Sequence, residues 1–423
     1  MNARTWALPL LVVLASMASA AWARAEAEED GQDAFVREVL ARSPRLRAGV
    51  LRRGAFREEA RASGTYPDPS VSVMVDRVPN RAPEGAEMPM IRYQVAQMVP
   101  WPGKLGLMRA AVERQEDAAD ADVDTQRLEL RLSARRGLAM LLLNTRRREI
   151  NRANRNLTAT IASATLGRYS AGLGGHHEVA RAQVEISALD IEYIDLEGER
   201  VSIVAMLNSL RDRPTDTAIA NPTRASSPPA EPPLAALTAR AINQRPELRG
   251  MRAMQNEALA MANLARKEPY PDLMGSAWVN QMMGAPITVG VMVGGTIPLF
   301  GISRQQHRAA AFDARADGAA QDQGAMRAMI RFEVADALVK VETAKRQLDL
   351  IENVALPKAR ESFEASLAGY GASTVDILGV LDARRALQNA ERALAEAQVS
   401  LQVSLAELER AQGSPFSGNG GAP

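Results

Sequence analysis

The feature that most restricts the fold of this chain is a strand that passes through a proline-glycine joint into a very long helix. It occupies residues 91–114, IRYQVAQMVPWPGKLGLMRAAVER. Alternation up to position 99 predicts a strand with one apolar face. That face holds Ile91, Tyr93, Val95 and Val99. Pro100, Pro102 and Gly103 end the strand, because proline lacks an amide donor and glycine loosens the backbone. From Lys104 onward the apolar period is that of a coiled-coil helix.

The same joint occurs a second time, at residues 287–308, where Pro298 and Gly301 separate an alternating segment from a helical one. The sequence before the joint recurs as well, since Tyr270-Pro271-Asp272 repeats Tyr66-Pro67-Asp68 at a distance of 204 positions. A joint and its flanking motif that both occur twice indicate an internal duplication.

Each copy is expected to contain a pair of strands and a long antiparallel helical hairpin. The first copy, residues 33–211, has strands at about 70–77 and 91–99 and a hairpin over 104–211; the second, residues 234–412, has strands at about 274–281 and 287–297 and a hairpin over 303–412. Residues 212–233 form a proline-rich, extended linker, and the glycine-rich tail, 413–423, is expected to be disordered. Pro357 predicts a kink in the second long helix. That kink either tapers the helix pair toward its tip or is tolerated on an outer face.

Residues 1–23 have the pattern of a cleavable secretory signal, with Arg4, a short apolar core, and small residues that place cleavage after about Ala20 or Ala23. A retained anchor is the alternative, although the apolar run is shorter than the about 20 residues of a membrane helix. The chain has no cysteine, which excludes disulfides, thiolate metal sites and a lipid anchor on cysteine. A formal net charge of +1 gives no reason to expect nucleic acid as a partner.

The predicted elements cannot be satisfied within one chain. Four strands with open edges leave unpaired backbone groups in lipid, and long helices with apolar seams need neighbours. The residues therefore predict a homo-oligomeric tube, mainly α with a small β part, and leave the number of chains open.

Five local sequences resemble the TolC family of outer-membrane efflux proteins: YPDPSVSV, VPWPGKLGL, YSAGLGG, RPELRG and VDILGVLDARRAL. Within that family the chain looks most like the outer-membrane components of heavy-metal resistance-nodulation-division pumps. The resemblance implies a homotrimer whose strands close a 12-stranded β-barrel in outer-membrane lipid and whose helices form an α-barrel in the periplasm of a Gram-negative bacterium. It also implies a periplasmic adaptor (membrane fusion) protein and an inner-membrane pump as partners, with the chain as a passive conduit.

The resemblance places adaptor docking at the two helix-hairpin turns. Tyr169, Gly172 and Leu173 match the family's turn in the first copy, and Tyr370 matches in the second, where Ser373 replaces the usual glycine. Plain helix termination explains the same glycine without a partner.

The resemblance also places acidic residues around a closed periplasmic aperture. Asp382 is the matching position, and Asp376 is the substitute for a second acid that Gly379 replaces. Symmetric carboxylates around one axis attract cations and repel one another. The alternative is a solvated carboxylate paired with Arg384 or Arg385.

No catalytic, cofactor or metal site is predicted. His176 and His177 are adjacent, so their side chains diverge, and no third ligand is apparent. Met282 and Met283 suit packing better than a relay for soft metals. The chain contains no nucleophile-base-acid set and no phosphate-binding loop, so we expect no enzymatic activity.

The leading interpretation is an exit duct of an efflux pump for metal ions or small toxic compounds. A periplasmic coiled-coil scaffold or chaperone would use the helices but not the paired strands. The exit duct of a type I protein secretion system has the same architecture, and the sequence does not separate it from the first interpretation.

Overall fold

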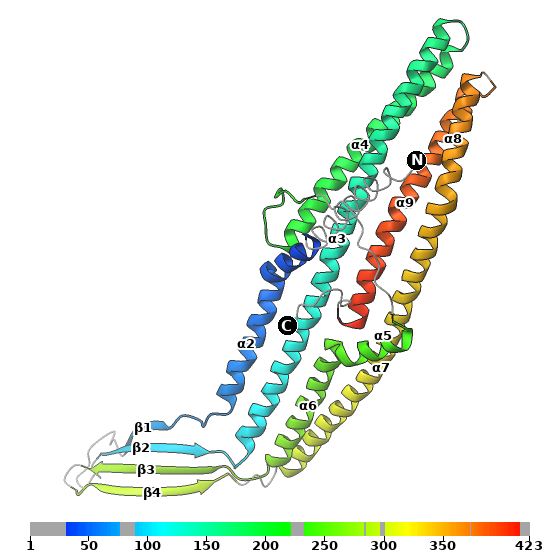
Figure 1. Ribbon diagram of the computed structural model, residues 1–423. Coiled ribbons are helices and arrows are strands. Elements are labelled where there is room, and N and C mark those ends of the chain that lie inside the picture. The colour runs from blue at the N-terminus through cyan, green and yellow to red at the C-terminus, as the bar shows by residue number, and fades with distance from the viewer. Residues whose placement is uncertain are drawn as a thin grey trace, which may run out of the picture. The chain divides into compact units, whose positions relative to one another are not determined.

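The computed structural model describes residues 31–76, 89–220, 232–282, 285–296, 301–372 and 374–414. The first half of the chain forms a helix over residues 31–42, α2 (Pro44–Ser63), β1 (Ser70–Asp76), β2 (Met90–Val99), α3 (Lys104–Ser170) and α4 (His176–Leu210). The second half forms α5 (Leu234–Gln244), α6 (Pro246–Lys267), β3 (Leu273–Met282), β4 (Thr288–Gly295), α7 (Ile302–Leu350), a π-helical turn η1 (Ile351–Ala355), α8 (Leu356–Gly371) and α9 (Ile377–Gln412). The predicted class, mainly α with a small β part, is confirmed (Figure 1).

The chain divides into two compact units, each of which takes segments from both halves of the sequence. The helical unit comprises Thr125–Arg245 with the described residues before 48 and after 328. The sheet unit comprises Ala48–Asp124 and Pro246–Ala328. The long helices α3 and α7 contribute residues to both units.

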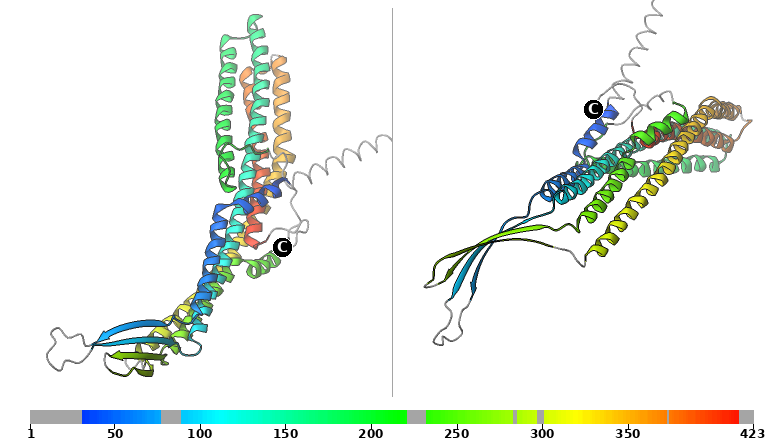
Figure 2. Two further views of the ribbon diagram at one scale, coloured as in Figure 1. Left: turned by 90° about the vertical axis from the view of Figure 1, so that its left-hand side faces the viewer. Right: turned by 90° about the horizontal axis from the view of Figure 1, so that it is seen from below.

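The sheet unit contains one antiparallel sheet in the order β1-β2-β3-β4 (Figure 2). Its register aligns Val73 with Tyr93, Tyr93 with Val279, and Val279 with Val289. Directly paired residues of neighbouring strands lie on the same face. The predicted apolar residues of β2 therefore share one face with the valines of β1 and β4. That face holds Val71, Val73, Val75, Ile91, Tyr93, Val95, Val99, Val279, Val289, Val291 and Val293.

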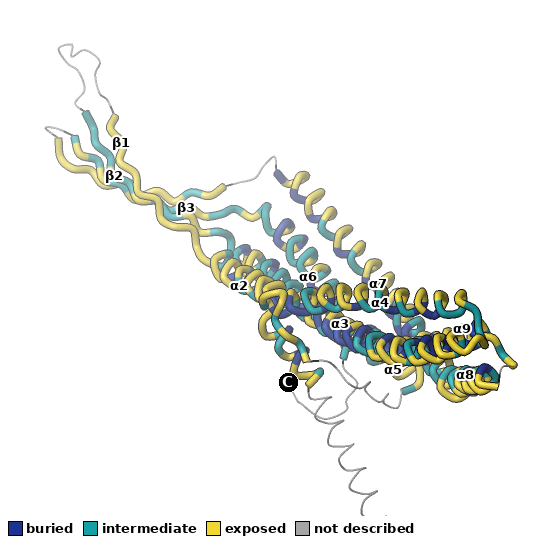
Figure 3. Tube along the Cα trace, turned by 90° about the horizontal axis from the view of Figure 1, so that it is seen from above, coloured by how far each residue is buried: buried dark blue, intermediate teal, exposed yellow. Residues whose placement is uncertain are grey.

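This valine face is exposed within the described chain, with Val71 at 74% and Val291 at 77%. The strand β1 is exposed along its whole length, as the yellow tube in Figure 3 shows. In the described residues, β1 and β4 each pair on one side only. A sheet with an apolar open face and two open edges is incomplete as a water-soluble structure.

The helical unit is held by apolar side chains along α3, α8 and α9. One buried cluster joins Ile161 to Phe363, Tyr370 and residues of the first turns of α9. Buried positions recur every seven residues along α4, at Ala182, Leu189, Leu196 and Ile203. The expected coiled-coil period is thus present in the packing. None of the described helices combines the length and the apolar character that a membrane-spanning helix needs.

The helix around Pro357 differs from a simple kinked α-helix. The backbone remains helical, but residues Ile351–Ala355 widen into a π-helical turn just before the proline. Proline removes the amide that would bond four residues back, and a π-turn is one way for a helix to accommodate that loss. The proposed taper remains a hypothesis.

Candidate functional site

The first joint is a compact polar cluster in the sheet unit. The Lys104 side chain is only 6% exposed, and its Nζ donates to the Asp272 carboxylate (2.9 Å) and to the Tyr270 carbonyl (2.9 Å). The Trp101 amide donates to the same carboxylate at 2.7 Å, and the Trp101 ring stacks on Tyr270 with centroids 5.4 Å apart. The recurring Tyr-Pro-Asp motif of the second half is therefore the partner of the first joint.

The electrostatics of the joint follow from this cluster. Burial alone would raise the pKa of Asp272, but the Lys104 ammonium and the Trp101 amide together hold it below its ordinary value. Gly103 has φ +88°, a conformation that L side chains rarely adopt, and this explains the glycine between Pro102 and Lys104. Sequence reasoning found the joint but not Asp272 as its partner; the repeated Tyr-Pro-Asp motif was the available clue.

The second joint is only partly described. Pro298 lies outside the described residues, whereas Gly301 is buried and its carbonyl accepts from Gln305 at the start of α7 (2.9 Å). Tyr66 of the first Tyr-Pro-Asp motif is 64% exposed. Its counterpart Tyr270 is stacked in the first joint, so the two copies differ in what they contact within one chain.

The first hairpin turn ends α3 with a Schellman motif. The Leu173 amide donates to the Arg168 carbonyl (2.8 Å), the Gly172 amide donates to the Tyr169 carbonyl (3.0 Å), and Gly172 has φ +72°. Helix termination therefore explains Gly172. It does not explain the exposure of Leu173 (68%) and Tyr169 (43%). These two side chains are the part of the predicted docking set that is displayed at this turn.

The second hairpin turn differs from the first. Tyr370 is 6% exposed, and its hydroxyl lies 3.3 Å from Thr165 Oγ1 of α3. The Arg168 guanidinium covers the Tyr370 ring at 4.7 Å and donates to the Tyr370 carbonyl. Tyr370 thus ties the end of α8 to α3. Ser373 lies outside the described residues, and docking at both turns stays a prediction.

The two predicted aperture acids have different local roles. Asp376 is the N-cap of α9, and its carboxylate accepts from the Gly379 amide at 2.9 Å. This cap explains why α9 begins at Ile377. The Asp382 side chain is 73% exposed and lies 3.4 Å from Arg385. One expected alternative, pairing with Arg385, is present, and a ring of Asp382 carboxylates remains a prediction.

Sequence reasoning missed a buried charged cluster beside Asp382. Arg384 is 1% exposed and pairs with Glu185 of α4 at 2.9 Å. It also donates to Gln388 at 3.0 Å. Arg385 binds the same Glu185 carboxylate. Hydrogen bonds from Arg385, together with the charges of both arginines, lower the pKa of Glu185 in spite of its burial. The only clue in the sequence was the Arg-Arg pair.

The residues suggestive of metal ligands do not form a carboxylate or imidazole site. The His176 ring makes an edge contact with Tyr169 at 5.7 Å. Among the described residues no group of three histidine, aspartate or glutamate side chains is placed to hold an ion. Met283 lies outside the described residues.

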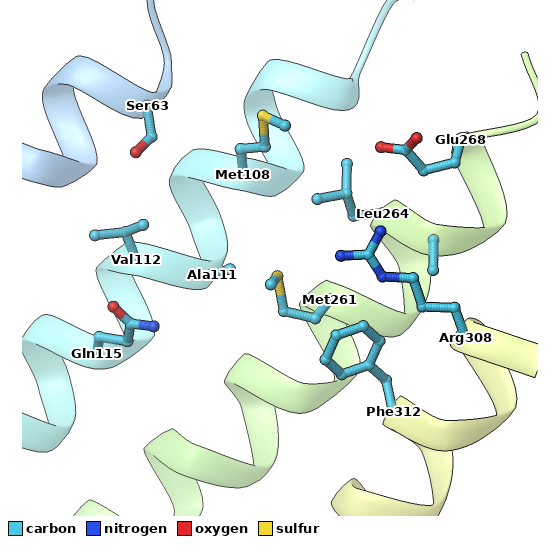
Figure 4. A pocket seen from close by; sticks show the side chains of 11 residues that line it. Ser63, Met108, Ala111, Val112, Gln115, Met261, Leu264, Glu268, Arg308 and Phe312 are labelled. Carbon is cyan, nitrogen blue, oxygen red and sulfur yellow. The ribbon is translucent and has the colours of Figure 1, made fainter. Parts of the chain in front are cut away.

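A cavity of about 360 Å³ in the sheet unit lies among α2, α3, α6 and α7. Its wall is mainly apolar, as Figure 4 shows for Met108, Val112, Met261 and Phe312. Arg308 and Glu268 supply the charged part of the wall. This arrangement offers packing surface and no set of side chains for covalent chemistry.

The fold is mainly helical with one four-stranded antiparallel sheet, and comparison with known proteins identifies the family. A model of the outer membrane efflux protein family matches residues 35–211 and again residues 237–414. The chain therefore belongs to the outer membrane efflux protein family, as its motifs predicted. Members of this family are transport ducts rather than enzymes, which confirms the expectation of no enzymatic activity.

Three known proteins show how far the similarity extends. The cobalt-zinc-cadmium resistance protein CzcC of Cupriavidus metallidurans is 24% identical over 289 residues, which is 67% of this chain and 68% of that protein. The outer-membrane channel OprN is similar in structure with a TM-score of 0.79 at 19% identity, over 91% of this chain and 90% of OprN. CusC, whose structures were described in terms of transmembrane channel formation, is similar with a TM-score of 0.78 at 17% identity, over 91% of this chain and 92% of CusC. The two structures support the fold.

Proposed function

We propose that the chain is the outer-membrane exit duct of a tripartite efflux pump. It conducts metal ions or small toxic compounds passively from the periplasm to the exterior. The observation that carries the proposal is the sheet, with strands of up to 10 residues, one exposed valine face and two open edges. A tilted strand of about 9–11 residues spans a bilayer. In a bilayer the apolar valine face would contact lipid instead of water. The open edges would still need hydrogen-bond partners, which strands from further copies of the chain can supply.

Three copies supply twelve strands, an even number within the range of bacterial barrels, which is roughly 8 to 26. The outer face is then the valine face, and the opposite face, with Arg92, Gln94 and Asn280, borders water. The helical units of three copies close the α-barrel that the long seams need. The similarity to outer-membrane channels supports this assembly.

The hairpin turns are the proposed contact with a periplasmic adaptor, which links the duct to an inner-membrane pump of the resistance-nodulation-division type. Leu173 and Tyr169 support this role because exposed large apolar side chains at a turn suit a protein partner. The similarity to a cobalt-zinc-cadmium resistance protein favours divalent metal ions over organic compounds as substrates. A scaffold or chaperone role has no use for the exposed valine face.

The test combines assembly with transport. Purified full-length protein is expected to migrate as a heat-modifiable trimer, to fractionate with the outer membrane, and to give discrete conductance steps in planar bilayers. A deletion strain is expected to become sensitive to cobalt, zinc or cadmium, and plasmid-borne protein to restore resistance. A monomeric periplasmic protein without conductance would contradict the duct. Sensitivity to organic toxicants alone would retain the duct and replace its substrate.

A further inference from the structure

The face of the sheet opposite the valines carries six methionines. In the register, Met74, Met90, Met98, Met274, Met282 and Met292 all fall on that face. They form two groups of three, one at each end of the sheet. The proximal group, next to the first joint, is Met98, Met274 and Met292; the distal group is Met74, Met90 and Met282.

The proximal methionines are close enough to share one ligand. Met98 is paired directly with Met274, and Met292, paired with Ser276, is one diagonal step from Met274. Direct and diagonal partners have Cβ atoms roughly 5 Å and 7–8 Å apart. The flexible thioether side chain spans such distances. The three sulfur atoms can therefore converge over Ser276.

Ser276 gives an independent reason to expect a ligand there. It is 7% exposed, and in the described structure its hydroxyl oxygen is buried without a hydrogen-bond partner. A buried hydroxyl in this state is costly. Its cross-strand neighbours are Met292 and Ala96, and Met274 precedes it by two positions on the same face.

The proximal methionines are not positioned as core packing. Their exposures are 45% for Met98, 40% for Met274 and 44% for Met292. Space remains on this face, because a Cβ placed on Gly294, opposite Met274, would meet no atom within 4 Å. Methionine used as a gap filler is normally enclosed.

The charges on this face separate the two groups. Asp76 and Arg92 are the ionisable residues of the described strands that fall on it. Arg92 is directly opposite Met74 of the distal group, where its guanidinium repels cations. It is six residues from Met98, roughly 20 Å along the strand. The nearest cation to the proximal group is the Lys104 ammonium of the neighbouring joint, and its charge is paired with the Asp272 carboxylate. On this face of the described strands, the proximal group therefore offers neutral sulfur ligands without an ionisable residue opposite them.

We propose that Met98, Met274 and Met292, with the Ser276 hydroxyl, form a binding site for a soft monovalent cation, Cu(I) or Ag(I). Thioether sulfur selects such ions, whereas divalent cations such as Zn²⁺ or Co²⁺ favour imidazole and carboxylate ligands. The site needs only the strand register and does not depend on which solute the duct carries.

The test uses Ag(I), which needs no reductant, and the purified full-length protein in chloride-free buffer. Equilibrium dialysis is expected to show one high-affinity silver ion per chain, and X-ray absorption to show sulfur neighbours. The triple variant M98L/M274L/M292L is expected to lose at least tenfold in affinity. The matched distal variant M74L/M90L/M282L is expected to bind silver as the unmodified protein does. Leucine conserves volume, so both variants should fold.

S276A is expected to weaken silver binding by about two- to fivefold, because three sulfur ligands remain. Unchanged affinity in the proximal triple variant, equal losses in both triple variants, or a silver spectrum without sulfur neighbours would overturn the site. Heat-modifiable migration of each variant checks its fold. Bilayer conductance is measured separately, so failure of the duct and failure of the silver site give different results.

Discussion

At the residue scale, a guanidinium group that is 1% exposed needs a charged partner, and Arg384 has Glu185. Such pairs contribute little when intact, since desolvation offsets their attraction, but removal of one partner leaves a buried charge uncompensated. Because Arg385 binds the same carboxylate, Glu185 holds two cations. One carboxylate therefore compensates the charges of two neighbouring arginines of α9.

Replacing Glu185 with glutamine is expected to destabilise the helical unit by roughly 3 kcal/mol at neutral pH. The pKa of Glu185 is lowered in the folded chain, first by Arg385 and then by Arg384. Its stabilisation is therefore fully present above the ordinary carboxyl value and is lost as pH falls through the lowered pKa. Thermal unfolding at neutral and acid pH should show the variant's deficit shrinking in acid. A pH-independent deficit would contradict the charge role, and D382N, at an exposed carboxylate, is the control.

A substitution at Gly103 tests whether the first joint requires glycine. G103A places a Cβ at φ +88° and is expected to destabilise the sheet unit by about 1–2 kcal/mol. Gly106, three residues on in α3, has no atom within 4 Å of its Cβ position, and G106A is expected to be neutral or to stabilise by up to about 1 kcal/mol. Denaturant unfolding compares them. Equal effects would mean that the joint does not require glycine.

At the element scale, α3 carries small or polar residues every seven positions on a buried stripe, at Asn144, Asn151, Thr158 and Thr165. Asn151 donates to the Leu189 carbonyl of α4 (3.1 Å) and to Glu192 (2.9 Å); Asn144 makes the matching bonds to Leu196 and Glu199. Polar groups at repeated seam positions fix the register of neighbouring helices. Asn144 and Asn151 are seven residues apart in α3, and so are their partners in α4. The same contact therefore fixes the alignment of α3 with α4 in two successive heptads.

Gly137 lies one repeat before Asn144, where side chains of α4 pack directly against the α3 backbone. A Cβ there would lie 2.5 Å from Leu207 and 2.9 Å from Met206. G137A is expected to destabilise the hairpin by about 1–3 kcal/mol through overpacking. G167A, on the same helix with no atom within 4 Å, should not, because alanine favours helix more than glycine does. Thermal unfolding followed at 222 nm distinguishes them, and equal stability of the two variants would place α3 and α4 further apart.

The strands and long helices could be predicted because local patterns encode them. Proline and glycine stop β2 at Val99, and an unbroken helical period carries α3 from Lys104 to Ser170. The pairs at the joint and the tip could not be predicted, because Lys104 and Asp272 are 168 positions apart and Arg384 and Glu185 are 199 apart. Tyr370 was expected at a docking tip by analogy with Tyr169; its burial depends on Thr165 and Arg168, which periodicity does not reveal.

At the scale of the whole molecule, the duplication predicts how the open edges meet. The joints are offset by 198 positions (Pro100 to Pro298) and the Tyr-Pro-Asp motifs by 204 (Asp68 to Asp272). Within the chain, Val95 pairs with Ala277. Applying the two offsets predicts that Val293 of one copy pairs with Val73 of the next. Both residues belong to the exposed valine face, so the predicted contact continues that face around the ring.

The chain has no cysteine, so the intermolecular register is directly testable. V73C/V293C is expected to form covalent multimers up to a trimer on oxidation or with a short thiol cross-linker, because directly opposed residues have Cβ atoms roughly 5 Å apart. V73C/V289C keeps the same face but displaces one thiol by four residues, roughly 13 Å, and is expected to remain uncross-linked. Denaturing gels after boiling report the outcome. If only the displaced pair cross-links, the intermolecular register differs from the predicted one by four residues. If neither pair cross-links, β4 of one copy does not pair with β1 of the next, and the proposed barrel does not close in this way.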